Sequence, residues 1–419
     1  MTKFEFKYGK TKKYFEIPKK NIIDVLEMHE VEPENRADKA LENALNNPFG
    51  KKQFKELIND KGPKNIVIIV SDITRPGPFN QILNPLLSKL ERMRINFKIE
   101  IVIASGTHRE MTEKEMRYQY GDYAVDNYPI YNHNCRADDL VNLGSLKSGI
   151  DLKINRKVYE ADFLITIGIL KPHYFAGFSG GRKSILPGIC GYETIRANHS
   201  KIIYKYARLG KMRGNKISKE MQEAADKVGV DFAINMLLNQ NKKIVHCLAG
   251  DITKILEKGS KIYKKEFSVK FDKKADIVFA SVGGYPKDLN FYQSQKTLNN
   301  VIGLVKENGT VVLVTASEEG IGQTELERVL LKANNLQELF DVEQSKIQIG
   351  GHRAFATGRL LQKADILVMS EMPDELVKNI LFNPISSFAE AFNFIKKKHG
   401  EDYSAYVVPS GSSLYAVQN

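Results

Sequence analysis

Short apolar runs recur along the chain, and each is followed by a polar or glycine-rich loop and a stretch of helical periodicity. Six of these runs lie at residues 65–71, 97–103, 163–169, 276–281, 310–314 and 364–369. Runs that are apolar at almost every position are typical of strands buried on both faces, and intervening helices are typical of parallel crossover connections. The pattern therefore predicts an α/β fold with largely parallel sheets.

The start of the chain has a different pattern. Apolar and polar residues alternate at 4–9 and at 13–17 around a Gly-Lys-Thr-Lys turn, which predicts a β-hairpin. Helices are predicted at 34–46, at 51–58, at 81–93, from Glu113 behind a capping box of Thr112 and Glu115, and at 193–209.

A chain of 419 residues is too long for one typical core, and two α/β domains are expected. The strand and helix pattern restarts near Ala275, after a charged helical stretch at 252–274. We predict an N-terminal α/β domain over 1–270, a C-terminal α/β domain over 275–400 and a C-terminal segment over 401–419. The apolar stretch Tyr406 to Pro409 in that segment predicts a strand, which could return to the N-terminal domain.

Composition narrows the class of protein. The net charge is +12, but the lysines are spread along the chain without a nucleic-acid-binding motif, so a basic surface for anionic substrates is favoured over nucleic acid. The three cysteines are far apart and form no CxxC pair, which argues against disulfides and thiolate metal sites. No window predicts a membrane span, and Met1 to Phe4 begin no signal peptide, so a cytoplasmic protein is expected.

Polar side chains follow three of the predicted strands. They are Asp72 and Arg75 after the first run, His108 after the second, and His173 with Lys183 after the third. Loops at the carboxyl ends of parallel strands meet at one edge of the sheet, where ligands bind in such folds. Each residue alone could be an ordinary surface or capping group, but three such loops together indicate a site.

The loop after the third strand is rich in glycine. Ser179, Gly180 and Gly181 could present bare backbone N–H groups to a phosphate, and Lys183 adds an amine that can bond covalently when desolvated. The spacing is not that of a Walker A loop. His199, on the helix that follows, could reach a ligand or a metal held there.

In the C-terminal domain, Gln293 and Lys296 lie three residues apart on a predicted helix, so they could offer paired donors to a carboxylate. A solvated amphipathic helix explains the same spacing. Zinc motifs are absent, and no GxGxxG follows the first strand, which gives a dinucleotide site little support. Two histidines in one pocket would suit an acid–base pair acting on opposite faces of a substrate, as racemisation requires.

Five segments, in order over nearly the whole chain, resemble those of lactate racemase and its relatives, the nickel-pincer-nucleotide-dependent 2-hydroxyacid racemases and epimerases. The resemblance is most specific in the glycine loop. The segments are Asp72-Ile73-Thr74-Arg75-Pro76, Ser105-Gly106-Thr107-His108-Arg109, Lys171-Pro172-His173 through Gly180-Gly181-Arg182-Lys183, Asn198-His199, and Tyr292-Gln293-Ser294-Gln295-Lys296-Thr297-Leu298.

The resemblance implies a mechanism. Lys183 would carry the nickel-pincer nucleotide (the nickel complex of pyridinium-3-thioamide-5-thiocarboxylic acid mononucleotide), and His199 would be the protein's ligand to nickel. His108 and His173 would exchange the hydroxyl proton while hydride passes to the cofactor, with a 2-keto acid as intermediate.

The resemblance also assigns the binding residues. Arg75, Gln293 and Lys296 would hold the substrate. Asp72 would hold the nucleotide's ribose, and Ser179, Gly180 and Gly181 would hold its phosphate. The active site would lie in the interdomain cleft, and separate proteins would make the cofactor.

The substrate implied is a small anionic 2-hydroxy acid. Lactate is the default, while malate or an aromatic or longer 2-hydroxy acid stays open. Ile73 is expected to vary with specificity, and Arg109 and Arg182 would tolerate a second carboxylate. Two other classes remain: a phosphate- or nucleotide-binding, dehydrogenase-like enzyme that uses the glycine loop non-covalently, and a non-enzymatic ligand-binding protein.

Overall fold

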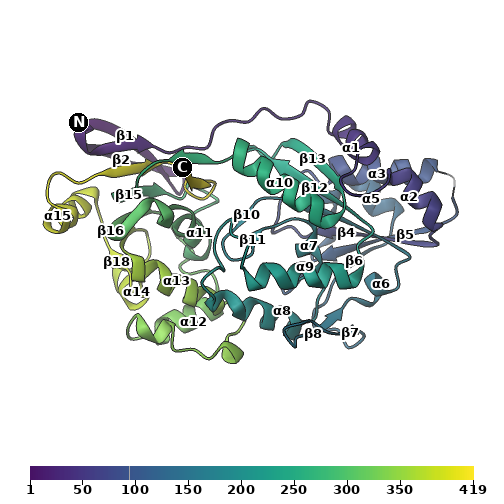
Figure 1. Ribbon diagram of the computed structural model, residues 1–419. Helices are drawn as coiled ribbons and strands as arrows, with labels where there is room; N and C mark the ends of the chain where they lie inside the picture. Colours follow the sequence, from purple (N-terminus) through teal and green to yellow (C-terminus); the bar gives the residue numbers. More distant parts are fainter. Residues whose placement is uncertain (94) are drawn as a thin grey trace. The chain divides into compact units, whose positions relative to one another are not determined.

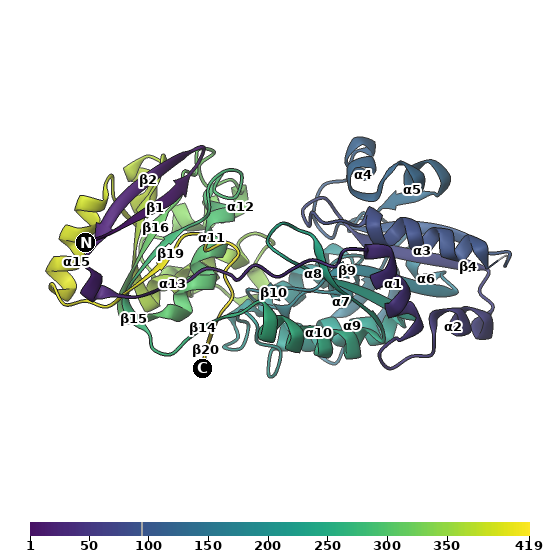
Figure 2. The ribbon, with the colours of Figure 1, turned by 90° about the horizontal axis from the view of Figure 1, so that it is seen from above.

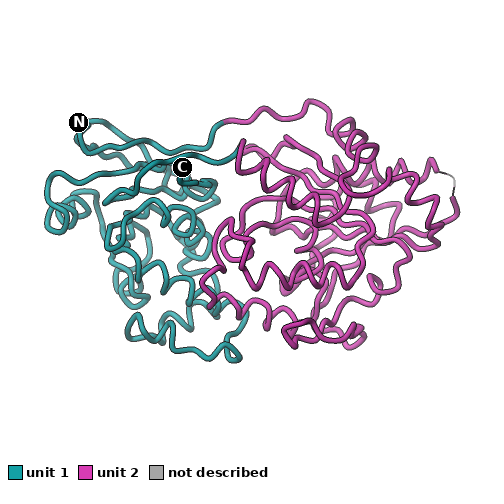
Figure 3. The backbone as a smooth tube through the Cα atoms, in the orientation of Figure 1, with its two compact units in different colours: residues 1–29, 267–419 teal, residues 30–266 magenta. Residues whose placement is uncertain are grey.

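The structure is a computed structural model, and it describes residues 1–93 and 95–419. The chain forms two compact units (Figure 3). One unit comprises Glu30–Glu266, and the other comprises Met1–His29 together with Phe267–Asn419.

The unit of residues 30–266 is built on a six-stranded sheet in the order β13-β12-β9-β4-β5-β6. Figure 1 labels all of these strands except β9. All neighbours in this sheet are parallel except β12 and β13. Its elements are α1 (Ala37–Asn46), α2 (Phe54–Lys61), β4 (Asn65–Ser71), α3 (Asn80–Arg92), β5 (Lys98–Ala104), α4 (Glu113–Tyr120), α5 (Asp122–Asn127), β6 (Ile130–Asn132), β7 (Val141–Ser145), β8 (Asp151–Ile154), α6 (Arg156–Tyr159), β9 (Phe163–Ile169), β10 (Pro172–His173), β11 (Gly177–Phe178), α7 (Gly181–Ile185), α8 (Tyr192–His199), the 3-10 helix η2 (Ser200–Ile203), α9 (Lys216–Val228), β12 (Phe232–Leu238), β13 (Ile244–Gly250) and α10 (Ile252–Glu266).

The two faces of this sheet explain why its strands are apolar at every position. On one face, Ile68 of β4, Ile101 of β5 and Ile165 of β9 pack with the apolar sides of α1, α2 and α3. On the other face, a side chain at Gly181 of α7 would meet Thr166 of β9, whose side chain points opposite to that of Ile165. Because helices cover both faces, the strands carry none of the alternation of a half-exposed sheet.

The other unit is built on a six-stranded, all-parallel sheet in the order β18-β17-β16-β15-β19-β3. Its elements are β1 (Thr2–Tyr8), β2 (Thr11–Ile17), the 3-10 helix η1 (Lys19–Asn21), β3 (Ile22–Val25), β14 (Val269–Phe271), β15 (Ala275–Ser281), α11 (Phe291–Val301), η3 (Ile302–Leu304), β16 (Val305–Val314), α12 (Thr324–Lys332), η4 (Gln337–Leu339), η5 (Gln344–Lys346), α13 (His352–Lys363), β17 (Ala364–Met369), α14 (Asp374–Asn379), β18 (Asn383–Pro384), α15 (Phe388–His399), β19 (Ala405–Val408) and β20 (Ala416–Gln418).

The predicted hairpin forms, as β1 and β2, and it covers one face of this second sheet beside α15 (Figure 2). Phe15 of β2 stacks on Phe279 of β15 and on Phe388 of α15, with ring centroids 5.3 Å and 4.2 Å away. The apolar face of an isolated hairpin needs such a partner, because two strands alone are marginally stable in water.

The compact units differ from the predicted domains at both ends of the chain. Residues 1–29 were predicted to belong to the domain over 1–270, but they pack with the C-terminal unit. The segment 401–419 stays in that same unit, where β19 pairs with β15 and β3. Each difference arises from long-range sheet and core contacts, which local pattern does not reveal.

The predicted fold class, α/β with largely parallel sheets, is confirmed, and the predicted strands match β4, β5, β9, β15, β16 and β17 within a few residues. Some helices are shorter than predicted. Instead of continuing through 209, α8 ends at His199 and gives way to η2. The helical stretch predicted at 252–274 ends at Glu266 and is followed by β14, and the helix predicted at 34–46 begins at Ala37. In the part of the chain that the structure describes, no helix is both long and apolar enough to cross a membrane.

Truncation of Phe15 tests the docking of the hairpin. We expect Phe15→Ala to lower the free energy of unfolding of the C-terminal unit by about 3–5 kcal/mol, the usual cost of removing a buried Phe side chain. Chemical denaturation followed by circular dichroism measures this loss. The matched control is Tyr14→Ala on the opposite face, where the side chain is 67% exposed, and it should change stability by less than about 0.5 kcal/mol. Equal effects of the two variants would contradict the assigned packing.

Candidate active site

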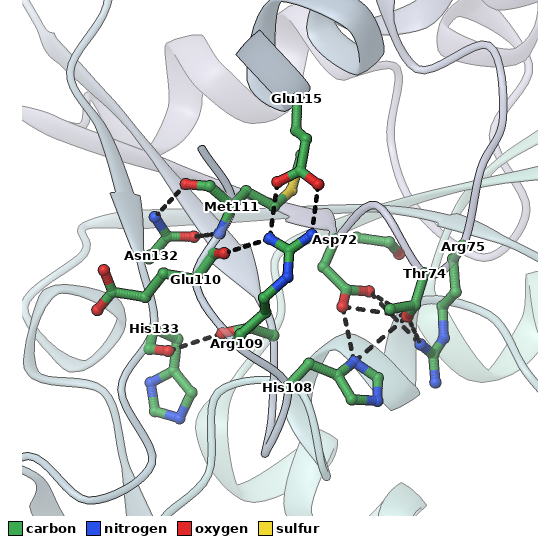
Figure 4. A network of polar contacts seen from close by, with 12 residues as sticks. Asp72, Thr74, Arg75, His108, Arg109, Glu110, Met111, Glu115, Asn132 and His133 are labelled. Carbon is green, nitrogen blue, oxygen red and sulfur yellow. Dashed lines mark hydrogen bonds and ion pairs between the residues drawn. The ribbon is translucent and has the colours of Figure 1, made fainter. Parts of the chain in front are cut away.

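The loops after β4 and β5 meet at a carboxylate–imidazole pair. Nδ1 of His108 lies 2.6 Å from Oδ2 of Asp72, and Figure 4 shows the two side chains pointing toward one another. Asp72 is buried, while 40% of the His108 side chain is exposed. The convergence predicted for these two loops is therefore present, because β4 and β5 are parallel neighbours.

Further contacts keep Asp72 ionised. Burial alone would raise the pKa of this carboxyl, but the hydrogen bond and charge of His108, the charge of Arg75 and a hydrogen bond from Thr74 hold the pKa below its usual value. Nη1 of Arg75 also donates to Oγ1 of Thr74 at 2.8 Å. A charged Asp72 accepts the Nδ1–H of His108, so the neutral imidazole presents Nε2 as a proton acceptor.

The loop after β5 is fixed by its own backbone. Gly106 has φ +57, a conformation that glycine adopts without strain, and its N–H donates to the carbonyl of Gly188 at 2.9 Å. Ser105 donates to the carbonyl of His133 at 2.6 Å. The predicted capping box is confirmed, since Thr112 and Glu115 both make their bonds at the start of α4. These contacts place His108 just ahead of that helix.

Arg109 is already paired. Its guanidinium binds the Glu115 carboxylate through two hydrogen bonds of 2.8 Å and 2.5 Å (Figure 4). Arg182 lies in the interior, where its guanidinium donates to the carbonyl and the hydroxyl of Ser218 and to the carbonyls of Ala176 and Phe178. Burial lowers the pKa of Arg182 to about 10. Neither arginine has the surroundings expected of a binder for a second substrate carboxylate.

The loop after β9 brings an amine to a second imidazole. Nζ of Lys183, on the short helix α7, lies 2.9 Å from Nε2 of His173, on β10. The Lys183 residue is 7% exposed. The chain between them turns back through the β10–β11 hairpin, where His173 pairs with Gly177.

Phe175 connects this pair to His199. Its ring lies 5.5 Å from Nζ of Lys183, and its centroid lies 4.9 Å from that of His199. His199 is buried at the end of α8. The structure thus gathers His173, Lys183 and His199 around one aromatic ring. The segment that carries His173 and Lys183 follows β9, the parallel neighbour of β4.

The glycines of this loop serve close packing. The N–H of Gly181 donates to Oδ1 of Asn235 at 2.9 Å, and a side chain at Gly181 would lie 2.4 Å from Oγ1 of Thr166. The N–H of Ser179 donates to the carbonyl of Lys171, and its hydroxyl donates to the carbonyl of Ile169. Two of the N–H groups assigned to phosphate therefore bond within the protein, and the assignment of this loop to the nucleotide stays a prediction.

Sequence reasoning missed two buried residues behind the site. Asn235 sits on β12, opposite Gly168 in the register, and is fully buried. Glu220 of α9 binds the amine of Lys201 and accepts a hydrogen bond of 2.8 Å from Asn198, which adjoins His199. A polar residue inside the apolar strand 232–238 was the one available signal for Asn235. Glu220 had no such signal, because a charged residue is ordinary on an amphipathic helix such as α9.

Gln293 and Lys296 lie on α11 of the C-terminal unit, and the amine of Lys296 donates to the Gln293 side chain. This contact confirms the prediction that the two side chains lie on the same side of a helix. Among residues 1–93 and 95–419, no group of three or more His, Cys, Asp or Glu side chains could hold a metal ion.

Comparisons with known families and relatives agree on one class of protein. Residues 8–210 match the family described as Lactate racemase N-terminal domain, and residues 270–416 match Lactate racemase C-terminal domain. The chain is 33% identical to the lactate racemase of Thermoanaerobacterium thermosaccharolyticum over 99% of both chains. It is 35% identical to that of Lactiplantibacillus plantarum over 88% of this chain and 89% of the relative.

Solved structures show the same relationship. The lactate racemase apoprotein from T. thermosaccharolyticum superposes with a TM-score of 0.91 at 32% identity, covering 99% of this chain and all of that one. A Thermotoga maritima protein, 17% identical with a TM-score of 0.68 over 93% of this chain and all of that one, shares the fold. The protein is an isomerase of the racemase class. It belongs to the lactate racemase family.

Removal of the Asn235 side chain tests its role behind the loop. Asn235→Ala leaves the N–H of Gly181 buried without its acceptor, and we expect a loss of about 1–3 kcal/mol in the free energy of unfolding of the unit 30–266. Denaturant unfolding measures it. Asn241→Ala, at an exposed turn, is the control and should be near neutral. A neutral Asn235→Ala would show that the loop does not depend on this bond.

Proposed function

We propose that this protein interconverts the enantiomers of a 2-hydroxy acid at C2, with lactate as its substrate, by reversible hydride transfer through a nickel-pincer nucleotide. The observation that carries the proposal is the pair of imidazoles at one sheet edge, His108 against the carboxylate of Asp72 and His173 against the amine of Lys183. Membership of the lactate racemase family supports the reaction class, and the curated relatives carry lactate racemase as their name.

His108 is suited to take the hydroxyl proton of one enantiomer. Its Nδ1–H is bound to Asp72, so Nε2 is free of a proton in the neutral ring and acts as the base. The charged Asp72 also stabilises the imidazolium that forms after proton transfer. This is the arrangement by which a buried carboxylate orients a catalytic histidine.

His173 would serve the other enantiomer. It comes from the loop after β9, and His108 comes from the loop after β5, so β4 lies between their parent strands in the sheet. Two bases supplied by separate loops can act on a substrate from different sides, and racemisation needs this. Each histidine would act as the base in one direction and as the acid in the other, so the reaction could run both ways.

The residues around Phe175 fit the cofactor. Lys183 supplies a buried amine for covalent attachment, and His199 supplies one imidazole, so nickel held here would take its other donors from the nucleotide. Asp72 would hold the ribose, and Ser179, Gly180 and Gly181 would adjoin the phosphate. When bound, the nickel-pincer nucleotide supplies a reversible hydride acceptor, which makes a 2-keto acid of the substrate.

Substrate recognition would rest on cations and donors from both units. Arg75, with 35% of its side chain exposed, would bind the substrate carboxylate beside His108, and Gln293 and Lys296 would add donors. That both units contribute to one site remains a prediction. The internal pairing of Arg109 and the burial of Arg182 favour an acid with one carboxylate, such as lactate, over malate.

We also propose a cytoplasmic location, which the three free cysteines support, and a dependence on separate proteins that make the cofactor. The alternative is a dehydrogenase-like enzyme that binds phosphate non-covalently at the glycine loop. The internal hydrogen bonds of the Ser179 and Gly181 N–H groups bear on phosphate binding in both proposals, so the covalent bond to Lys183 is what distinguishes them.

The first test is racemisation itself. Protein purified from cells that make the nucleotide should convert D-lactate and L-lactate to an equal mixture, followed by chiral chromatography without added nicotinamide cofactor. Lys183→Arg cannot form the covalent bond and should lose both the adduct, read by intact mass, and the activity. Retention of activity in Lys183→Arg would refute the covalent mechanism, and oxidation of lactate that needs a nicotinamide cofactor would favour the alternative.

Neutralising Asp72 tests the orientation of His108. Asp72→Asn should lower kcat by about 10²- to 10⁴-fold, because the amide can stabilise the wrong imidazole tautomer and no longer stabilises the imidazolium. Racemisation kinetics measure the effect, and nickel content by mass spectrometry separates it from loss of cofactor. Asp126→Asn, an exposed carboxylate that pairs with Arg117, is the control and should leave kcat unchanged. Unchanged kcat in Asp72→Asn would remove Asp72 from the mechanism.

A further inference from the structure

Lys183 has surroundings that are unusual for a lysine. Its amine lies at 2.9 Å from a ring nitrogen of His173, and the residue is 7% exposed against the face of Phe175. An isolated charge is costly in such surroundings. The hydrogen bond with His173 therefore bears directly on the protonation state of the amine.

A backbone hydrogen bond determines which ring nitrogen of His173 carries the proton. The N–H of Ala176 donates to Nδ1 of His173 at 3.3 Å. A ring nitrogen that accepts a hydrogen bond carries no proton, so the neutral imidazole must carry its proton on Nε2. Nε2–H then donates to Nζ of Lys183. Only a neutral amine has the lone pair to accept that bond, since an ammonium group is a donor alone.

We infer that His173, fixed in this tautomer by Ala176, holds Lys183 as a neutral nucleophile and carries the proton during covalent attachment of the cofactor. This inference rests on the proposed function, because it takes Lys183 as the attachment point. It gives His173 a task before racemisation begins.

The attachment step balances without an oxidant or a further reactant. Nζ of Lys183 forms a bond to the carbon of a thiocarboxylic acid group on the nucleotide, and the carbon–oxygen bond breaks. The departing oxygen leaves as the hydroxyl group of the acid and takes the Nε2–H proton of His173, and Nζ returns one of its protons to Nε2. The products are a thioamide on Lys183 and one water molecule, and His173 ends in its starting state.

Attachment then changes the partner of His173. The nitrogen of a thioamide delocalises its lone pair, so it no longer accepts a hydrogen bond from Nε2–H. The Nε2–H group of His173 is released from Lys183 and becomes available to donate to a substrate oxygen. The same imidazole would therefore serve the covalent attachment first and proton exchange with the substrate afterwards. To take a hydroxyl proton, its own proton must first move from Nε2 to Nδ1, which breaks the hydrogen bond from Ala176.

Competitive labelling of the apoprotein tests the state of the amine. At pH 7 an ordinary lysine is neutral in roughly one molecule in a few thousand. With trace acetic anhydride, Lys183 should therefore acetylate faster than the exposed Lys3, as read by peptide mass spectrometry. In His173→Gln the amide oxygen can accept from an ammonium group, and labelling of Lys183 should fall by about 100-fold or more.

The controls separate this effect from general damage. His246→Gln, at an imidazole paired with Glu266 in the same unit, should leave the labelling of Lys183 unchanged. Lys3 should label alike in all three proteins. Thermal unfolding by circular dichroism identifies a misfolded His173→Gln, in which case labelling is compared in His173→Asn. Equal labelling of Lys183 in wild type and in a folded His173 variant overturns the inference.

A second measurement distinguishes this inference from the proposed function. Wild type and His173→Gln are purified from cells that make the nucleotide, and the adduct on Lys183 is quantified by intact mass. An adduct in wild type alone supports the role of His173. Equal adducts in both overturn that role and leave the proposed function standing. No adduct in wild type overturns covalent attachment and the inference with it.

Discussion

The packing of a glycine-rich loop against the middle of a buried sheet is the constraint on which the site depends. Gly168 of β9 and Gly180 before α7 both face the Asn235 side chain, where an added Cβ would lie 3.2 Å and 3.1 Å from its amide atoms. This close approach lets the N–H of Gly181 reach Asn235. The amine of Lys183, two residues later, is held where the β10–β11 hairpin brings His173.

The electrostatics of the site follow from the same burial. Arg182 enters the interior beside Lys183, and it remains there because backbone carbonyls and Ser218 receive its N–H groups. Lys201 and Glu220 form a buried ion pair behind His199. Breaking such a pair by removing one partner is costly, so the pair ties η2, which carries Lys201, to α9, which carries Glu220. The reactive groups lie at the sheet edge in two pairs. The imidazole of His108 contacts the carboxylate of Asp72, and the amine of Lys183 contacts the imidazole of His173.

The sequence predicted much of the fold because its signal is local. A largely apolar run of seven residues such as 163–169, followed by a glycine-rich loop, predicts a strand covered on both faces, and Thr112 with Glu115 predicts the start of α4. The sequence also identified the loops that hold polar chemistry, since Asp72, His108 and Lys183 each follow such a strand. The meeting of Asp72 and His108 followed from parallel strand order alone.

Tertiary structure alone decided the rest. The hairpin of residues 2–17 belongs to the C-terminal unit because Phe15 finds its stacking partners there, more than 260 residues away in sequence. Arg182 and Lys183 are neighbours in sequence, yet one is sealed by carbonyls and the other faces an imidazole. Sequence determines which residues are strands, helices and reactive groups, because backbone and side-chain preferences are local. Their partners, and hence their charge and reactivity, depend on which distant segments pack against them.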